Sequence, residues 1–380
     1  MLMRLIFIFL LALVPFHHNA AVEAIEVSEL RKLAAKNNVT CILVFGDSSV
    51  DPGNNNHIST INKADYLPYG MDLPNSQPTG RFSNGKLATD FIAEALGYVN
   101  LTRGFLDPQI NKVDMLHGIS FASAASGYDD LTANLSNAMT LAKQREYLGH
   151  YEIHLRQMVG AEKAKETMKN ALYIISMGTN DFLQNYFVEL VRSKQYTVEQ
   201  YQNFLIHSLF THVKLAHISL FNQILLFSIS TSKRIIHGQG ARRIAVVGVP
   251  PLGCEPLLRT IRDDETKCDD DLNKVAFSFN LKIKRELQAL KRLFGIKASY
   301  IDIYSIILEA VQNPHKFGFT ETSKGCCGTG TTEYGETCKG LKACADRTKF
   351  VFWDAVHPSE KMYKIMADEA LKAINVDLLD

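Results

Sequence analysis

Five short runs of apolar residues, separated by helical stretches, constrain the fold of this chain more than any other feature. They are Cys41–Phe45, Ile119–Phe121, Leu172–Met177, Ile244–Val249 and Ser299–Ile303, and four of them are almost continuously apolar. Strands that are buried on both faces of a parallel sheet have this pattern, whereas strands with one wet face alternate between apolar and polar residues. We therefore expect an α/β fold with a helix-covered parallel sheet.

The composition agrees with a large folded unit of this kind. The 380 residues are 46% hydrophobic and 21% charged, which supports a sizeable core and excludes a disordered or fibrous chain. Lys and Arg together number 41, against 40 for Asp and Glu. Because this balance leaves no electrostatic footprint for a nucleic-acid backbone, we expect chemistry on a small molecule and no nucleic-acid partner.

Two of the helices have recognisable ends. The stretch Leu87–Leu96 is followed by Gly97, and the amphipathic stretch from about Asp271 to Phe294 is followed by Gly295. Glycine just past the last helical residue is a common stop signal. Both segments are therefore predicted to be helices of the layers that cover the sheet.

A third predicted helix is too long to pack along one strand. Thr197 and Gln200 form a capping box, and a helix from there to Gly238 would be roughly 60 Å long at 1.5 Å per residue. Strands of ~17–20 Å require about a third to a half of that length. We interpret residues 213–232, which are apolar on every side, as an insertion. A membrane-associating hairpin, an added subunit contact and an in-frame retained intron are the open explanations, although the polar residues within the segment make it a poor membrane span.

The N-terminus predicts export. Arg4 precedes an apolar run, Leu5–Phe16, and small residues follow it, which is typical of a signal peptide covering residues 1–24. An uncleaved anchor is the alternative, but a run this short does not span a bilayer without help. Glycosylation sequons begin at Asn38, Asn100 and Asn134. We expect residues 25–380 to form a single domain that is secreted to the extracellular space as a glycoprotein.

The use of cysteine points to the same compartment. Six cysteines lie in loop-like stretches where a disulfide can fasten an irregular segment: Cys254, Cys268, Cys326, Cys327, Cys338 and Cys344. The first two form the simplest local pair, whereas spacing does not determine the pairing of the other four. A zinc site built from those four is the alternative, but adjacent cysteines do not match the C-x₂₋₄-C knuckle. We expect disulfides, a single unpaired thiol at Cys41, and neither a metal nor a cofactor.

A candidate nucleophile and a candidate base lie near opposite ends of the chain. Ser48 follows the first predicted strand, and open α/β sheets bind ligands in the crevice outside the carboxyl ends of their strands. Near the C-terminus, Pro358 biases His357 toward an extended conformation, and the three-residue offset lets the Asp354 carboxylate reach the imidazole. Such a pair can fix the tautomer of His357 and stabilise the imidazolium that forms when it takes the proton of Ser48. Taken singly, a turn like the one that contains Ser48 is usually only a turn, and a pair like Asp354 and His357 is more often a structural hydrogen bond.

Two loops that follow middle strands offer hydrogen-bond donors for an oxyanion. Gly178–Asp181 follows the third strand, so the amide of Asn180 can project into the same crevice. Gly118–Gly127 contains small residues that let a backbone N–H approach a ligand closely. Acyl transfer needs such donors, since the loss of one typically costs about 10²–10³ in rate.

In this order, each after a strand, these segments resemble the GDSL lipase/esterase family, the SGNH hydrolases, in its plant-type secreted branch. Further matching segments are Arg81–Gly85, Gly240–Arg243, Pro250–Cys254 and Cys326–Gly328, so that the resemblance covers nearly the whole mature chain. The resemblance implies that Ser48 is the nucleophile, His357 the general base and then acid, and Asp354 its orienting carboxylate.

It also implies three oxyanion donors: the backbone N–H of Ser48, the side chain of Asn180, and the backbone N–H of Ala124, which aligns with a glycine of the family. The implied fold is a three-layer α/β/α sandwich of the SGNH or flavodoxin-like type, with a five-stranded parallel sheet. The implied activity is hydrolysis of carboxylic esters, including acyl lipids, without a cofactor.

Two other functions stay open at this stage. The enzyme would be an acyltransferase if a hydroxyl group replaced water as the acyl acceptor. A secreted binding protein that has lost turnover through Ala124 or the insertion is the second alternative, although all three triad positions are kept. The natural ester is not determined by the sequence, and acyl lipids, cutin-like polyesters, acetylated polysaccharides and phenolic esters are all candidates.

Overall fold

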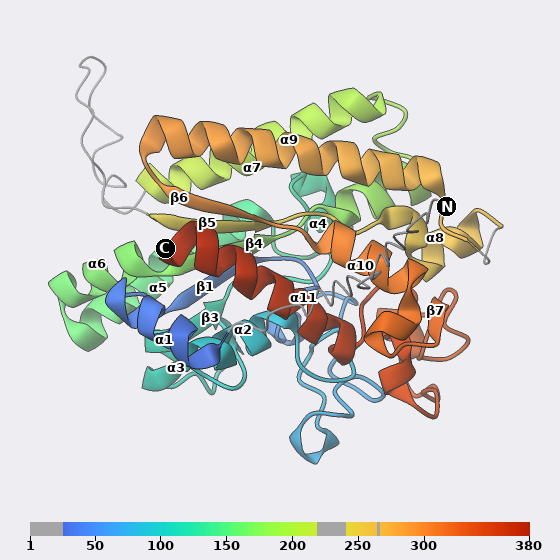
Figure 1. Cartoon of the computed structure of the whole chain (residues 1–380), viewed down its shortest axis with the longest axis horizontal. Helices are drawn as coiled ribbons and strands as arrows, with labels where there is room; N and C mark the ends of the chain where they lie inside the picture. The colour runs from blue at the N-terminus through green and yellow to red at the C-terminus, as the bar shows by residue number, and fades with distance from the viewer. Residues whose placement is uncertain (1–25, 219–240, 264–266) are drawn as a thin grey trace, which may run out of the picture.

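A six-stranded parallel sheet forms the centre of the computed structural model (Figure 1), which describes residues 26–218, 241–263 and 267–380. Its strands are β1 (Ile42–Gly46), β2 (Arg103–Gly104), β3 (Gly118–Ser120), β4 (Leu172–Ser176), β5 (Arg243–Val247) and β6 (Lys297–Ile301). The five apolar runs therefore all become strands. The predicted count of five is one too low, because β2 consists of two residues, an arginine and a glycine, and has no apolar run.

The order of the strands is β2-β3-β1-β4-β5-β6, and every neighbouring pair is parallel. β1 thus lies between β3 and β4, so the chain builds the sheet first to one side of β1 and then to the other. Ligands of open α/β sheets bind at such a switch point, outside the carboxyl ends of the strands. The loop after β1, which contains Ser48, lies at this point.

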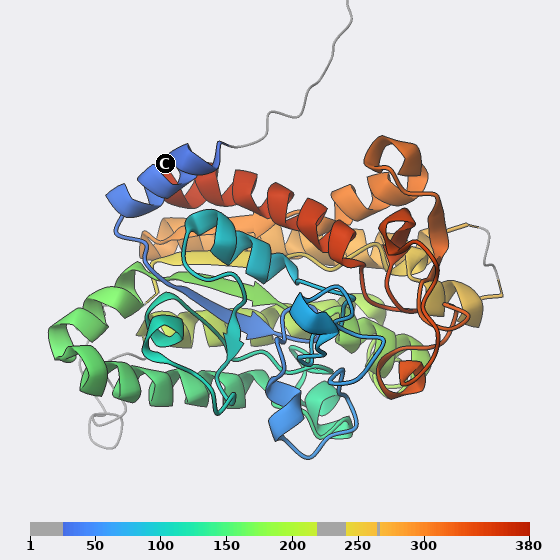
Figure 2. The same cartoon turned by 90° about the horizontal axis from the view of Figure 1, so that it is seen from below.

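Helices cover both faces of the sheet. The α-helices of the described residues are α1 (Val27–Lys36), α2 (Ala88–Leu96), α3 (Lys112–His117), α4 (Asp130–Leu135), α5 (Leu141–Val159), α6 (Ala161–Asn170), α7 (Val198–Ile218), α8 (Pro256–Ile261), α9 (Asp270–Phe294), α10 (Ile303–Gln312) and α11 (Glu360–Ile374). Figure 2 shows the sheet between α1, α2 and α11 on one side and α5 on the other. The three-layer α/β/α arrangement is confirmed.

Alternate residues of β1 pack into two separate hydrophobic clusters, one on each face of the sheet. Leu43 and Phe45 pack in a cluster with buried residues of α5, α6, α7 and α9. Ile42 and Val44 pack in a second cluster with buried residues of α1, α2, α10 and α11. Because both faces of the strand are dry, its sequence is apolar without alternation.

The predicted helix ends are confirmed. α2 and α9 stop at Gly97 and Gly295, whose φ angles of 81° and 62° place them in the left-handed region. At the start of α7 the N–H of Thr197 donates to Oε1 of Gln200 at 2.9 Å, and the N–H of Gln200 donates to Oγ1 of Thr197 at 3.3 Å. α7 continues to Ile218, and the rest of the predicted 213–232 insertion lies outside the described residues. No helix in the described part of the chain is long and apolar enough to cross a membrane.

A small irregular unit lies beside the carboxyl edge of the main sheet. It contains β7 (Glu321–Gly325), β8 (Phe350–Phe352) and a third hydrophobic cluster that includes Tyr69, Phe82 and Trp353. Disulfides Cys326–Cys344 and Cys327–Cys338 fasten this unit, and Cys254–Cys268 closes a loop elsewhere. The zinc alternative is wrong, because all four of its proposed thiols are paired with one another. The remaining cysteine, Cys41, is buried and unpaired.

Candidate active site

The turn after β1 presents Ser48 at the carboxyl edge of the sheet. Oδ1 of Asp47 accepts hydrogen bonds from the backbone N–H of Ser49 at 3.0 Å and from its hydroxyl at 2.8 Å. The N–H of Asp47 in turn donates to the carbonyl of Ser176, at the end of β4, at 3.1 Å. These bonds tie the turn to the neighbouring strand. Ser48 itself, which is 8% exposed, is left with its hydroxyl directed at His357.

Ser48, His357 and Asp354 form one hydrogen-bonded chain. Nε2 of His357 lies 2.8 Å from Oγ of Ser48, and Nδ1 lies 2.9 Å and 2.8 Å from the two carboxylate oxygens of Asp354. Oδ1 of Asp354 also accepts the backbone N–H groups of Val356 and His357, at 2.8 Å and 2.7 Å. The carboxylate is completely buried, so these donors fix the ring that it faces. The structure therefore brings together the three residues that the sequence singled out.

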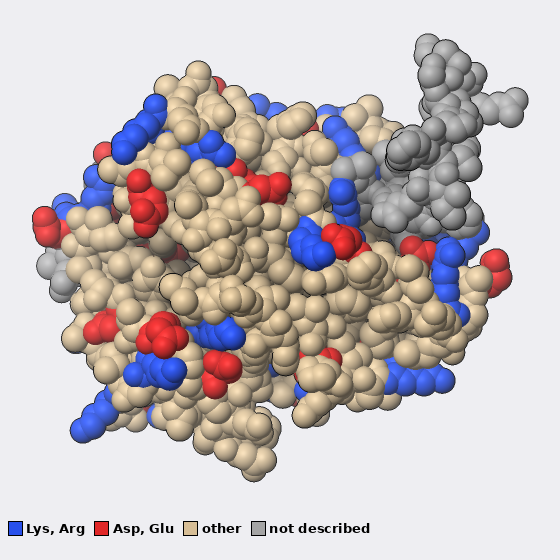
Figure 3. Space-filling model, turned by 180° about the vertical axis from the view of Figure 1, so that it is seen from behind, with Lys and Arg blue, Asp and Glu red and all other residues tan. Residues whose placement is uncertain are grey.

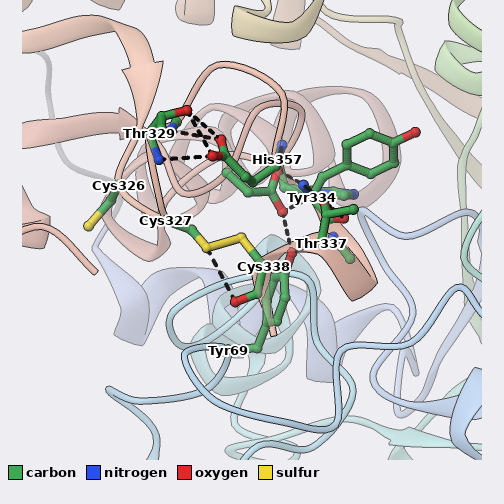
Figure 4. The surroundings of a disulfide bond; sticks show 12 residues. Tyr69, Cys326, Cys327, Thr329, Tyr334, Thr337, Cys338 and His357 are labelled. Carbon is green, nitrogen blue, oxygen red and sulfur yellow. Dashed lines mark hydrogen bonds and ion pairs between the residues drawn. A yellow bond between two sulfur atoms is a disulfide. The ribbon is translucent and has the colours of Figure 1, made fainter. Parts of the chain in front are cut away.

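Tyr69 completes the surroundings of the carboxylate. Its hydroxyl donates to Oδ2 of Asp354 at 2.7 Å and accepts the N–H of Gly335 at 2.7 Å. Tyr69 lies beside the Cys327–Cys338 disulfide and reaches toward the segment that carries His357 (Figure 4). Burial and then the charge of Asp354 raise the pKa of Tyr69 well above its usual value, so it stays a neutral donor. No sequence pattern points to Tyr69, because 285 residues separate it from Asp354.

The candidate oxyanion donors differ by one residue from those expected. The N–H of Ala124 donates to Oδ2 of Asp51 at 3.0 Å and is therefore not available to a ligand, so the prediction for Ala124 is corrected. Ala125 is next to it in the wall of the cleft and has a φ of 67°, in the left-handed region that glycine occupies most easily. Neither its N–H nor that of Ser48 has a hydrogen-bond partner in the described part of the chain. A backbone angle of this kind leaves no mark in the sequence when the residue is an alanine.

Asn180 lies in the same wall of the cleft. Its Nδ2 donates one hydrogen to the carbonyl of Ser126 at 2.9 Å, which fixes the amide plane and leaves the second hydrogen for a ligand. Ser48, Ala125 and Asn180 all line one cleft, together with His357. The arrangement can hold a negatively charged oxygen next to an attacking hydroxyl.

The cleft has a volume of about 670 Å³ and is lined by both polar and apolar residues. Five of its lining residues are large hydrophobic side chains that are well exposed: Ile61, Leu135, Val188, Ile261 and Tyr334. Lys63 and Glu189 supply its charges, one of each sign. On the face of the molecule drawn in Figure 3, acidic and basic side chains are likewise interspersed. A cleft of this kind suits a neutral molecule with an apolar part.

A Ser–His–Asp chain at the carboxyl edge of a parallel sheet, beside a cleft with N–H donors, defines the class of the serine hydrolases with an α/β fold. The comparison with known families agrees, since the model of the GDSL-like lipase/acylhydrolase family matches residues 42–370. The chain belongs to this family.

Similar plant proteins cover the chain at nearly full length. The GDSL esterase/lipase At5g45950 of Arabidopsis thaliana is 50% identical over 373 residues, which are 98% of each chain. The GDSL esterase/lipase APG of the same plant is 42% identical over 334 residues, covering 87% of this chain and 89% of its own. The protein is a carboxylic ester hydrolase.

Among solved structures, a catalytic mutant of Axe2, an acetylxylan esterase from Geobacillus stearothermophilus, is similar over 89% of this chain and 93% of its own. The TM-score is 0.35 and the sequence identity is 12%, so this likeness carries no argument about the present site.

Proposed function

We propose that the protein hydrolyses small-molecule carboxylic esters, acyl lipids included, with Ser48 as nucleophile, His357 as general base and acid, and Asp354 as the carboxylate that orients His357. The observation that carries this proposal is the chain of hydrogen bonds from Oγ of Ser48 through both ring nitrogens of His357 to the buried Asp354. Each of its contacts is at 2.9 Å or less.

The mechanism follows from these contacts. Oγ of Ser48 attacks the ester carbonyl carbon while Nε2 of His357 takes its proton. The tetrahedral intermediate then collapses, and His357 gives the proton to the leaving alcohol. In the second half, His357 takes a proton from water, the water oxygen attacks the acyl carbon, and Ser48 leaves with that proton. Asp354 keeps Nδ1 protonated throughout, so that Nε2 is the free base at the start of each half.

The oxyanion of both intermediates is bound by three donors, the N–H groups of Ser48 and Ala125 and the amide of Asn180. All three residues line the cleft beside His357. Ala125 thus takes the place of Ala124 in the set of donors that the sequence predicted. Their presence also argues against a binding protein that has lost turnover, because an alanine still provides the N–H that this position requires.

We further propose that residues 1–24 are a signal peptide and that residues 25–380 form a single domain that is secreted to the extracellular space. The three disulfides support an oxidising route. The sequon residues Asn38, Asn100 and Asn134 are all exposed, which glycosylation requires. Residues 213–232 stay a proposed insertion, with a retained intron as one origin, and sequencing of the abundant transcript tests that origin directly.

The experiment that tests the catalytic proposal compares Ser48→Ala with Ser59→Ala in the secreted chain. Ser59 also lines the cleft but is exposed and lies outside the triad, so its substitution is the matched control. Hydrolysis of a short p-nitrophenyl ester should fall by at least about 10⁴-fold in Ser48→Ala and stay near wild type in the control. Substantial hydrolysis in Ser48→Ala would reject Ser48 as nucleophile.

The same pair of variants in a chain lacking residues 213–232 tests the insertion. If that segment is foreign to the fold, the shortened chain should be secreted in higher yield and with full Ser48-dependent activity. Loss of secretion on shortening would show that the segment belongs to the folded protein.

A further inference from the structure

A second, smaller cavity adjoins the catalytic residues. Its volume is about 50 Å³. Ser48, Asn180, Val356 and His357 line both this cavity and the substrate cleft, so the catalytic hydroxyl and imidazole stand between the two spaces. Its other walls come from the ends of β4 and β5 and from α10 and α11, behind the catalytic residues. This cavity therefore reaches the reacting atoms by a route that substrate does not occupy.

Two residues that line this cavity each carry a buried polar atom without a hydrogen-bond partner in the described part of the chain: Oε2 of Glu255 and the hydroxyl of Tyr363. Glu255 is 2% exposed and Tyr363 is 0% exposed. Buried polar groups in proteins are nearly always paired with protein or with ordered water, because an unpaired one costs stability. Two such residues in the wall of one cavity point to a ligand that both of them bind.

The charge and size of the cavity define that ligand. Burial, and then the charges of Asp47 and Asp354, raise the pKa of Glu255 well above its usual value, which favours its neutral form. A neutral carboxyl and a phenol both donate and accept hydrogen bonds. One water needs roughly 10–15 Å³ of such space, so the cavity has room for about three to five. An organic ligand does not fit a space this small.

We propose that this cavity is a water-binding site, held by Glu255 and Tyr363, and that it supplies the water that hydrolyses the acyl-enzyme. The proposal rests on the triad proposed above. When an acyl chain fills the cleft, bulk water reaches Ser48 poorly from that side. A water from the cavity can instead give a proton to Nε2 of His357 while its oxygen attacks the acyl carbon. The bond to Oγ of Ser48 then breaks, Ser48 recovers the proton from His357, and the carboxylic acid leaves through the cleft.

The site bears on the choice between hydrolysis and acyl transfer. An acceptor alcohol must enter through the cleft, whereas water is also bound in the small cavity behind the catalytic residues. Glu255 and Tyr363 are thus positioning residues for water, and they favour the acid over the transferred ester as product. This effect acts after the acyl-enzyme has formed, so it changes the ratio of products more than the rate of acylation.

The partition of the acyl group tests the proposal. The full-length protein is given p-nitrophenyl laurate, whose long acyl chain occupies the cleft, and a fixed concentration of ethanol, and lauric acid and ethyl laurate are both quantified. In Glu255→Met, which removes the polar anchor at similar size, the ratio of ester to acid should rise about fivefold, as expected for one lost hydrogen bond. Glu255→Gln and Tyr363→Phe should give smaller increases, since each keeps part of the anchor. Glu369→Met, at a half-buried position of α11 that lines neither the cleft nor this cavity, is the matched control and should keep the wild-type ratio.

A Glu255→Met protein that folds, forms the acyl-enzyme and keeps the wild-type ratio would overturn the proposal. A crystal structure of the wild-type protein tests it without any variant, since at least one ordered water should lie within hydrogen-bonding distance of Glu255 and Tyr363. A cavity without water density would also overturn it. If the wild-type protein forms no acyl-enzyme on Ser48, the catalytic proposal fails instead, and the crystal structure still decides whether the water site exists.

Discussion

Replacing Asp354 by Asn tests the role of the buried carboxylate most sharply. In either orientation of the Asn amide, its NH₂ group faces a hydrogen-bond donor that the carboxylate accepts. The carboxylate accepts four donors: two backbone N–H groups at Oδ1, the Tyr69 hydroxyl at Oδ2, and Nδ1 of His357, which lies 2.9 Å from Oδ1 and 2.8 Å from Oδ2. The two backbone donors already occupy Oδ1, so Oδ2 is the main acceptor for Nδ1. The amide oxygen of Asn has to replace Oδ1, since backbone donors do not rotate. The NH₂ group then faces Nδ1 of His357.

An NH₂ group in that position forces Nδ1 of His357 to accept, so the proton moves to Nε2. Nε2 lies 2.8 Å from Oγ of Ser48, and in its protonated form it accepts no proton from the hydroxyl. The expected loss in kcat is about 10⁴-fold, the size found when a triad carboxylate is replaced in this way. Because the shape of the side chain is kept, KM should change little.

Steady-state hydrolysis of a p-nitrophenyl ester measures this loss, with Asp302→Asn as the control. Asp302 is the N-cap of α10, and Asn caps a helix equally well, so this variant should keep its activity. If Asp354→Asn retained more than about a tenth of the wild-type kcat, the tautomer of His357 would not depend on Asp354 and the reasoning would fail.

Three further outcomes are expected. Tyr69→Phe leaves the buried N–H of Gly335 without its acceptor and should lower the free energy of unfolding by about 2 kcal/mol in a urea titration; an unchanged midpoint would contradict this. Ala125→Gly relieves the left-handed backbone at this position and should raise stability by about 1 kcal/mol, with a higher melting temperature, whereas a lower one would show that φ is not strained there. Burial, and then the charge of Arg145, lower the pKa of His212 to about 4. The unfolded chain therefore binds more protons than the folded protein between pH 6.5 and 4, and stability falls on acidification through this window. His212→Leu should lose less stability than wild type between pH 7 and pH 5, which melting temperatures at both values would show.

The sequence predicts the sheet well because a strand that is buried on both faces is a continuous run of apolar residues, which is visible in the sequence. Each apolar run became a strand, and the glycines after α2 and α9 ended those helices. The exception is β2, whose two residues are held at the edge of the sheet by backbone pairing with β3 rather than by burial of apolar side chains. Backbone hydrogen bonds of this kind are independent of residue type, so no sequence pattern reports them.

The site was predictable where chemistry requires a particular side chain, and less so where it requires a particular backbone. Ser48, Asp354 and His357 stand out because the proposed reaction needs their functional groups. The choice between Ala124 and Ala125 depends on which N–H is free, and this is decided by Asp51, far away in the sequence. Tyr69 and Glu255 were missed for a similar reason, since only the folded chain shows that they lie behind the triad.

The distance along the chain between nucleophile and base has a consequence for biosynthesis. Ser48 and His357 are 309 residues apart, and the last strand of the main sheet ends at Ile301, 357 − 301 = 56 residues before the base. At about 5–20 residues per second, a ribosome needs about 15–60 s to pass from the nucleophile to the base. A nascent chain can therefore have every strand of its sheet while it still lacks the imidazole that we propose as the base, and we expect messages truncated before codon 357 to encode proteins without esterase activity.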